Sequence, residues 1–254
     1  MWYTFSPALV VVLTLPPLVA LKHWVTRHLQ GLGFLLWGHS DMAMLLYFLV
    51  MLPGIVLHEL SHWACAQLLG VKTGKIEIWP SRKGRGRIRL GSVRIGRADS
   101  FRASLIGLAP FITGCLAIYV IGDYVLGIGY IIDPVLEGNF SLFQRHLSSF
   151  FRASDLWIWL YVIFAISNTM FPSESDRESW GPVLMLLGGV MALGLLFGLD
   201  SRIPPTVTAV LLDLVRYLAY AFTLTVAVNI VFTLAIALLE KLIEIMAGRR
   251  VDYG

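Results

Sequence analysis

His58-Glu59-Leu60-Ser61-His62 lies within an apolar segment, residues 42–69, that is long enough to cross a membrane. Residues four apart share one face of a helix, so His58 and His62 can chelate a single metal ion. Glu59 then points toward the open side of that ion, where a general base would act. Two histidines that merely pack in the core are the alternative, but burying three titratable side chains in lipid without a function is costly. The pattern therefore predicts a catalytic zinc site.

The composition predicts an integral membrane protein. Hydrophobic residues make up 57% of the 254 residues and charged residues 14%, and the mean hydropathy is +0.75. These values lie outside the usual range of soluble globular domains. A chain of this length holds about five or six membrane spans and leaves no room for a separate soluble domain. The two cysteines, Cys65 and Cys115, lie far apart in apolar stretches and indicate no disulfide framework.

Six apolar segments are predicted to span the membrane, within a single domain of residues 1–254. The second segment contains Pro53-Gly54 one turn before His58, which predicts a kink beside the motif. The fold class that we expect is an all-α polytopic membrane protein of about six transmembrane helices. The predicted spans are approximately 2–21, 42–69, 103–132, 156–171, 181–199 and 217–239.

The segment from residue 71 to residue 102 is strongly basic, with ten Lys/Arg and two acidic residues. Apolar and charged residues alternate around Ile76 and again around Ile88, as they do in half-exposed strands. The alternation slips by one position at Gly91-Ser92, which indicates a bulge or a turn. We therefore predict short strands over residues 74–97 that form a small antiparallel β-meander on the membrane surface, after the second helix.

The charge distribution also predicts the orientation of the chain. A basic loop in a multispanning protein is typical of a cytoplasmic loop that faces anionic lipid, so we expect membrane lipid and not nucleic acid as its partner. Alternation of the spans then places the basic loop and the active-site end of the chain on the cytoplasmic side. The sequence carries no signal for an oligomeric state.

A catalytic zinc ion usually has three protein ligands and leaves its fourth position to water, so the histidine pair requires a third ligand. Cys65 follows His62 by three residues on the same helical face. A ladder of three ligands on one straight helix climbs about 10 Å, however, and cannot readily surround one tetrahedral ion. The end of the fourth span is a better donor, and it offers three carboxylates among which the residues alone do not choose: Glu174, Asp176 and Glu178.

Three features together resemble the site-2 proteases, the intramembrane zinc metalloproteases. They are the His58-Glu59-x-x-His62 motif in a span, the basic β-rich loop after it, and a segment with Asn168, Pro172 and Asp176 that closes a later span. In that family an Asn precedes the metal-binding Asp by eight residues, with a Pro between them. The resemblance covers about residues 42–180 and implies that Asp176 is the third ligand.

Some family motifs differ in this chain. The usual Leu-Asp-Gly reads Ser175-Asp176-Arg177, Pro172 lies one position later than in the common pattern, and Gly107-Leu108-Ala109-Pro110 takes the place of Ala-Gly-Pro. The chain also has no room for the PDZ-like accessory domain of many relatives. Substrate choice would then depend on the membrane core itself.

The resemblance implies one Zn²⁺ per chain that activates a water molecule, with Glu59 as the base that takes the proton of that water. Asn168 is implied as a helper donor or a substrate clamp, although an amide that only packs two helices together is the alternative. The substrate would be a transmembrane segment of another protein, which an edge of the 74–97 strands could hold extended by strand addition. The resemblance assigns the metal ligands as His58, His62 and Asp176.

A membrane protein that binds metal without proteolysis, either a transporter or a scaffold, is the alternative function. It accounts for the histidines but not for Glu59, since a transport site needs no general base beside its first ligand. The two halves of the chain also show no inverted repeat of the kind that many transporters carry. We therefore favour the intramembrane metalloprotease.

Overall fold

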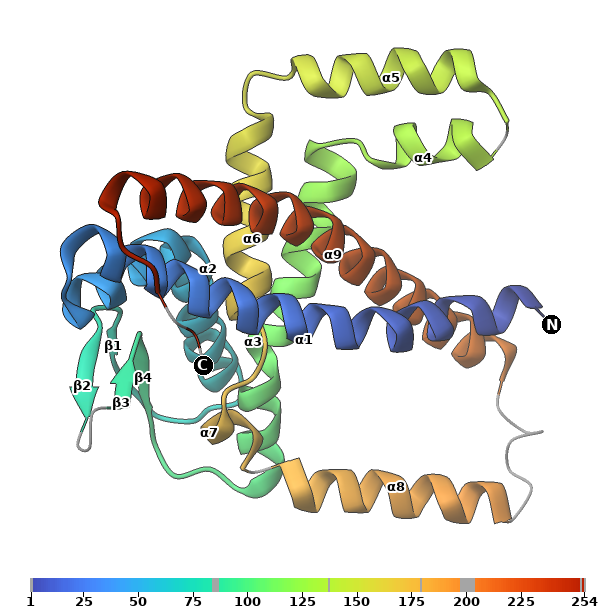
Figure 1. Cartoon of the computed structure of the whole chain (residues 1–254). Coiled ribbons are helices and arrows are strands. Elements are labelled where there is room, and N and C mark those ends of the chain that lie inside the picture. The colour runs from blue at the N-terminus through green and yellow to red at the C-terminus, as the bar shows by residue number, and fades with distance from the viewer. Residues whose placement is uncertain are drawn as a thin grey trace.

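The computed structural model describes residues 2–83, 87–136, 138–178, 180–196, 204–251 and 253. These residues are mostly helical, and a small pair of strand ladders lies at one end of the helices (Figure 1). The helices are α1 (Trp2–Trp37), α2 (Ser40–Leu68), α3 (Ser100–Val120) with a π-helical turn η1 (Ile121–Val125), α4 (Gly129–Leu136), α5 (Phe140–Arg152), α6 (Leu156–Thr169), α7 (Glu174–Arg177), α8 (Trp180–Leu196) and α9 (Pro205–Ala247).

Four helices of the described chain are long and apolar enough to cross a membrane: Pro7–Trp37, Ser40–Leu68, Ser100–Val125 and Pro205–Ala247. A fifth candidate is the pair α5 and α6, which are bent by 85° where they meet. The predicted count of about six is not confirmed. Helix α6 has 14 residues and the described part of α8 has 17, so they measure about 21 and 26 Å against a hydrocarbon core of about 30 Å.

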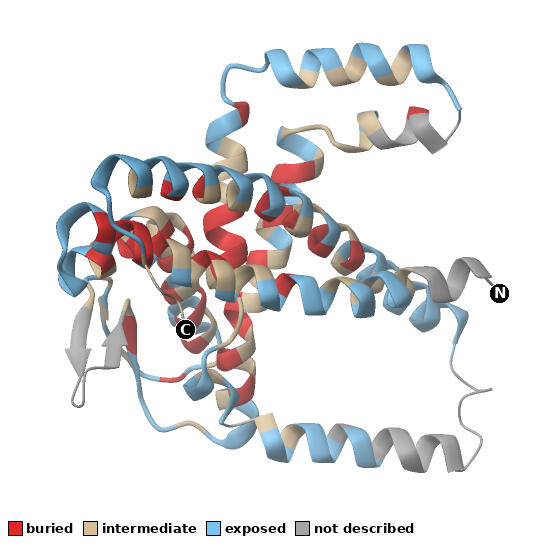
Figure 2. Ribbon diagram, viewed as in Figure 1, coloured by how far each residue is buried: buried red, intermediate tan, exposed pale blue. Residues whose placement is uncertain are grey.

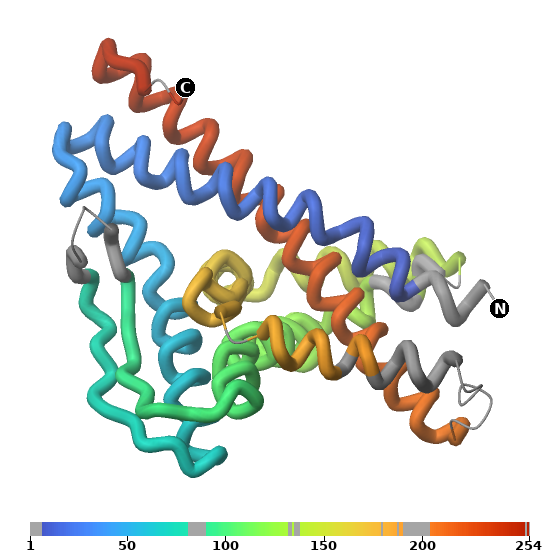
Figure 3. The backbone as a smooth tube through the Cα atoms, turned by 90° about the horizontal axis from the view of Figure 1, so that it is seen from below, coloured from blue at the N-terminus to red at the C-terminus, as the bar shows by residue number. Residues whose placement is uncertain are grey.

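The helices do not share one axis. Figure 3 looks nearly along α6, whereas α1 and α9 lie across the same view, side by side and running in the same direction. Helix α1 is longer than the predicted span 2–21, because it continues through the polar stretch after Lys22 to Trp37. Buried leucines and a valine explain this continuation, since they repeat at helical spacing along one face: Leu18, Val25, Leu29 and Leu32.

The core lies where α1, α2, α3, α6 and α9 cross (Figure 2). Its largest fully buried side chains include Phe48 and Met51 of α2, Phe164 of α6 and Phe222 of α9. Many large apolar side chains outside this core are exposed, such as Leu234, which is 66% exposed. Exposed apolar side chains of this kind are compatible with a bundle that faces lipid.

The C-terminal tail folds back onto α1 and α9. The hydroxyl of Tyr253 donates a hydrogen bond to the carboxylate of Glu240, a buried residue of α9. The other oxygen of this carboxylate lies 2.5 Å from Nδ1 of His28, on α1. The His28 ring is in turn stacked on Trp24 with ring centres 3.8 Å apart. Three separate parts of the chain therefore meet at one buried carboxylate.

The basic segment forms a long hairpin, so the predicted meander is wrong in its topology. The outer strands β1 and β4 pair antiparallel with Ile76 opposite Val93, and the inner strands β2 and β3 pair antiparallel with Arg82 opposite Ile88. Because the pair β2–β3 lies between β1 and β4 in the sequence, the chain reverses direction once, between β2 and β3. A meander of four strands would reverse three times. The strands are β1 (Thr73–Glu77), β2 (Ser81–Lys83), β3 (Arg87–Arg89) and β4 (Ser92–Ile95).

Candidate metal centre

Helix α2 presents His58 and His62 on one face, as their spacing predicts. Their Nε2 atoms lie 3.1 Å apart. The helix runs through Pro53 without a break, and Gly54 is the residue that places it against α6. A Cβ atom at Gly54 would lie 2.2 Å from the carbonyl oxygen of Ala165, which no real contact allows. The glycine therefore lets α6 approach the helix one turn before the motif.

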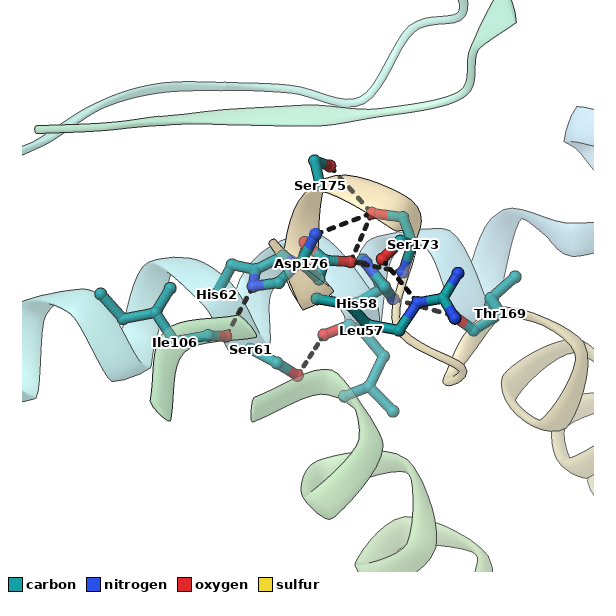
Figure 4. A network of polar contacts seen from close by, with 10 residues as sticks. Leu57, His58, Ser61, His62, Ile106, Thr169, Ser173, Ser175 and Asp176 are labelled. Atoms are coloured by element: carbon teal, nitrogen blue, oxygen red, sulfur yellow. Dashed lines mark hydrogen bonds and ion pairs between the residues drawn. The ribbon is translucent and has the colours of Figure 1, made fainter. Parts of the chain in front are cut away.

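Both imidazoles are oriented by main-chain carbonyl groups (Figure 4). Nδ1 of His58 lies 2.8 Å from the carbonyl oxygen of Thr169, at the end of α6, and Nδ1 of His62 lies 2.8 Å from that of Ile106, in α3. A carbonyl oxygen only accepts, so each Nδ1 carries the proton and each Nε2 keeps its lone pair. Metal-binding histidines typically have such a partner, because it fixes the tautomer and the ring orientation.

Asp176 reaches the two histidines from α7, a short helix that a capping box begins. The carboxylate accepts hydrogen bonds from the main-chain N–H of Ser173 at 2.7 Å and from its hydroxyl at 2.6 Å. Burial alone would raise the pKa of Asp176, but the adjacent His62 imidazole and the hydrogen bonds from Ser173 outweigh it and hold the pKa well below its usual value. Asp176 is therefore held as a carboxylate in a fixed orientation.

A glycine of α3 supports this position. A Cβ atom at Gly107 would lie 2.3 Å from the main-chain oxygen of Asp176. Helix α3 thus packs directly on the main chain of α7, and the same helix supplies the Ile106 carbonyl to His62. Neighbouring residues of α3 therefore position two of the three predicted ligands.

The three predicted ligands meet at one point. Asp176 Oδ2 lies 3.7 Å from Nε2 of His58, and Asp176 Oδ1 lies 3.3 Å from Nε2 of His62. Ligand atoms at zinc-binding distance from a tetrahedral ion are about 3.3–3.6 Å apart, and the three separations, 3.1, 3.3 and 3.7 Å, lie close to that range. Two neutral imidazoles with their lone pairs turned toward one carboxylate are the donor set that a divalent cation stabilises. In the described chain, this is the group of His, Cys, Asp and Glu side chains that could hold a metal ion.

The competing ligands lie outside this group. Cys65 packs beside a small apolar cluster formed by Ala66, Val71 and Ile106. Cys115, the other cysteine, also lies outside the metal-binding group. Glu174 and Glu178 are exposed. The structure therefore places Asp176, and not Glu174 or Glu178, beside the two histidines. The sequence alone could not choose among these three carboxylates.

Glu59 is buried and lines a cavity of about 630 Å³ that also contains the ligand group. The chain between β3 and β4 covers it closely, since a Cβ atom at Gly91 would lie 2.8 Å from Oε1 of Glu59. The hairpin therefore passes over Glu59, the predicted general base, at Gly91-Ser92, where the alternation of apolar and charged residues slips by one position. Strand β4 contributes Val93 and Ile95 to the wall of the same cavity.

Asn168 reaches the cavity wall but is engaged in helix packing. Its amide donates to the Phe164 carbonyl and to Oδ1 of Asn229, both at 2.8 Å, which uses both of its hydrogens. Asn229, on α9, donates in turn to the hydroxyl of Ser167 at 2.8 Å. The helper role of Asn168 stays a prediction, and it requires the amide to release one of these partners.

Sequence reasoning did not find several residues of the site. The carbonyl groups of Ile106 and Thr169 leave no mark in a sequence. Lys22, which lines the cavity from α1, was interpreted as the end of the first span. The presence of a charged residue within an apolar run was the sequence signal that could have identified Lys22 as part of the site.

Comparisons of the chain with protein-family models, with curated proteins and with solved structures found no match.

Proposed function

We propose that the chain is an intramembrane metalloprotease of the site-2 protease type, which hydrolyses peptide bonds within or near the transmembrane segments of other proteins. The observation that carries the proposal is the meeting of His58, His62 and Asp176 beside a buried Glu59 in one cavity. Three protein ligands with a general base beside them are the donor set of catalytic zinc sites in proteases.

The metal that these ligands would hold is Zn²⁺, one per chain. Two imidazole nitrogens and one carboxylate suit it, and these groups lie within 3.1–3.7 Å of one another at their closest atoms. When bound there, zinc would supply a Lewis acid that lowers the pKa of water and polarises a carbonyl group. The Thr169 and Ile106 carbonyls would keep both Nε2 atoms turned toward it.

Glu59 is the general base and then the general acid in this proposal. Its carboxylate takes a proton from the attacking water, and the oxygen of that water forms the new bond to the peptide carbonyl carbon. The carbon–nitrogen bond then breaks, and Glu59 returns the proton to the departing nitrogen. The cover of Leu90 and Gly91 over the cavity would keep other water away from this proton transfer.

The substrate must be extended at the cleaved bond, because a helical peptide bond is shielded by its own hydrogen bonds. Strand β4, whose Val93 and Ile95 line the cavity, could hold such a segment by strand addition. The substrate class is a membrane protein that presents an apolar segment to this cavity.

The proposed location is a membrane, which the chain crosses several times. The basic hairpin and the ligand end would face the cytoplasm and contact anionic lipid. Support comes from the four or five helices of membrane length and from the excess of Lys/Arg in residues 71–102.

The test measures two properties of the same purified protein, its zinc content and its cleavage of a reporter. The purified protein in detergent is analysed for bound metal and incubated with a tagged, membrane-anchored reporter. We expect Glu59→Gln to keep zinc and to abolish cleavage, because the amide preserves the shape of the side chain but cannot accept the proton of water. Retained cleavage in this variant would refute the mechanism. Stoichiometric metal without any cleavage by the unaltered protein would favour the transporter or scaffold.

A further inference from the structure

Lys22 is a cation in the wall of the metal-site cavity, although it comes from α1 and not from the helices that carry the ligands. Its ammonium group lies 5.3 Å from the centre of the Phe171 ring. It is near enough to His58 and to Arg177 to interact electrostatically with both. In the part of the chain that the structure describes, the ammonium group has neither a hydrogen bond nor an ion pair.

A lysine within an apolar helix is costly unless it faces a polar cavity, and such residues usually mark a binding or transport site. The Phe171 ring stabilises the cation through its face but offers no hydrogen-bond acceptor. The three donors of the ammonium group are therefore available to a molecule in the cavity. A packing role alone would not require a charge at this position.

The charge balance of the site favours an anion as that molecule. A divalent ion at the three ligands would be balanced by the carboxylates of Glu59 and Asp176. The charge of Lys22 would then remain unbalanced. Arg177 adds a second positive charge nearby, and its Nε donates to the main-chain oxygen of Ser173, at 3.4 Å. With a divalent ion bound, the cavity would thus combine apolar walls with an unbalanced positive charge at Lys22.

We propose that Lys22 binds a carboxylate of the substrate and so makes the cavity selective for an apolar segment that carries one. This inference rests on the proposed proteolytic function. The carboxylate is either an acidic side chain near the cleaved bond or the free carboxyl end of a chain. Apolar residues around the cavity, including Ile55, Val93 and Phe171, exclude water and strengthen a charge-assisted hydrogen bond.

The experiment measures the cleavage efficiency, kcat/KM, of the zinc-loaded protein on matched reporters. One set carries a single Glu, Gln or Lys at successive positions of the apolar segment. A second set has no acidic residue and ends inside the segment with either a free carboxylate or an amide. The first set detects recognition of a side chain, and the second detects recognition of a chain end.

We expect the Glu reporter to be cleaved about tenfold more efficiently than the Gln reporter at one position, or the carboxylate end about tenfold better than the amide. Lys22→Met should bring this ratio to about one. Lys22→Glu should reverse it and favour the Lys reporter. Arg27→Met is the matched control, because Arg27 is an exposed cation five residues further along the same helix, and it should keep the unaltered ratio.

The outcomes separate this inference from the function on which it rests. Cleavage with a ratio near one for every reporter would refute the role of Lys22 and leave the protease standing, as would an unchanged ratio in Lys22→Met. No cleavage of any reporter by the zinc-loaded protein would refute the protease itself. If Lys22→Met does not fold, the reversal in Lys22→Glu and the retained ratio in Lys22→Arg carry the same test.

Discussion

Replacing Gly107 by alanine is expected to displace Asp176 without touching any ligand side chain. The added Cβ atom would lie 2.3 Å from the main-chain oxygen of Asp176 and 3.1 Å from its carbonyl carbon. These are main-chain atoms that cannot rotate away, so α7 must move by about 1 Å to reach an ordinary contact of about 3.4 Å. Metal–ligand distances tolerate only about 0.2 Å. The substitution should therefore remove the carboxylate from the metal site.

We expect Gly107→Ala to weaken zinc binding by about 100-fold, or about 2.7 kcal/mol. The cleavage rate should fall by at least the same factor, because misplacing a reacting group by about 1 Å lowers the rate about 100-fold. Zinc affinity is measured by competition with a chromogenic chelator, and folding is followed by the thermal transition of the metal-free protein. Gly181→Ala is the matched control, since a Cβ atom there has no neighbour within 4 Å.

Wild-type zinc affinity and cleavage in Gly107→Ala would refute this reasoning. Either Asp176 would not be a ligand, or α3 would not determine its position. A metal-free protein that melts at the unaltered temperature but binds zinc weakly would support both parts. Equal losses in Gly107→Ala and Gly181→Ala would point instead to a general effect of added methyl groups.

Three further predictions concern the third ligand, the orientation and the tail. Asp176→Ala should lose zinc and cleavage in the metal and reporter assays, whereas Cys65→Ala, Glu174→Ala and Glu178→Ala should keep most of both; an empty site in Cys65→Ala with a filled one in Asp176→Ala would contradict the assignment. Cysteines introduced at residues 80–86 of the basic segment should react with membrane-impermeant reagents from the cytoplasmic side only, and labelling from the other side would invert the topology. Tyr253→Phe should lower the free energy of unfolding by about 1.5–3 kcal/mol, because the Glu240 carboxylate loses a donor; an unchanged denaturation midpoint would show that the tail contact contributes nothing.

Local spacing predicted the part of the site that one helix carries. His58, Glu59 and His62 fall on α2 at helical spacing, and the geometry of a helix alone brings the two imidazoles together. Asp176 lies more than a hundred residues later, and the choice between it and its neighbouring carboxylates came from a family resemblance. No local rule links two helices at that separation, so its position became visible only in the packing of α3 on α7.

The remaining errors also have physical causes. The polar stretch after Lys22 suggested the end of a span, but a buried apolar face continues through it and keeps α1 helical to Trp37. Strand propensity around Ile76 and Ile88 was interpreted correctly as strands. Pairing was not predictable, because alternation specifies which face of a strand is buried and not which strand lies beside it.

The use of main-chain carbonyls to hold His58 and His62 has a consequence for mutagenesis and for evolution. Every residue type offers a carbonyl oxygen, so no change of side chain at Thr169 or Ile106 can delete the acceptor itself. A saturation screen would therefore report on these positions only through the packing of their side chains, such as that of the buried Ile106, and not through the acceptors themselves. Only chemistry that alters the backbone, such as replacing the amide with an ester, would make these two contacts visible.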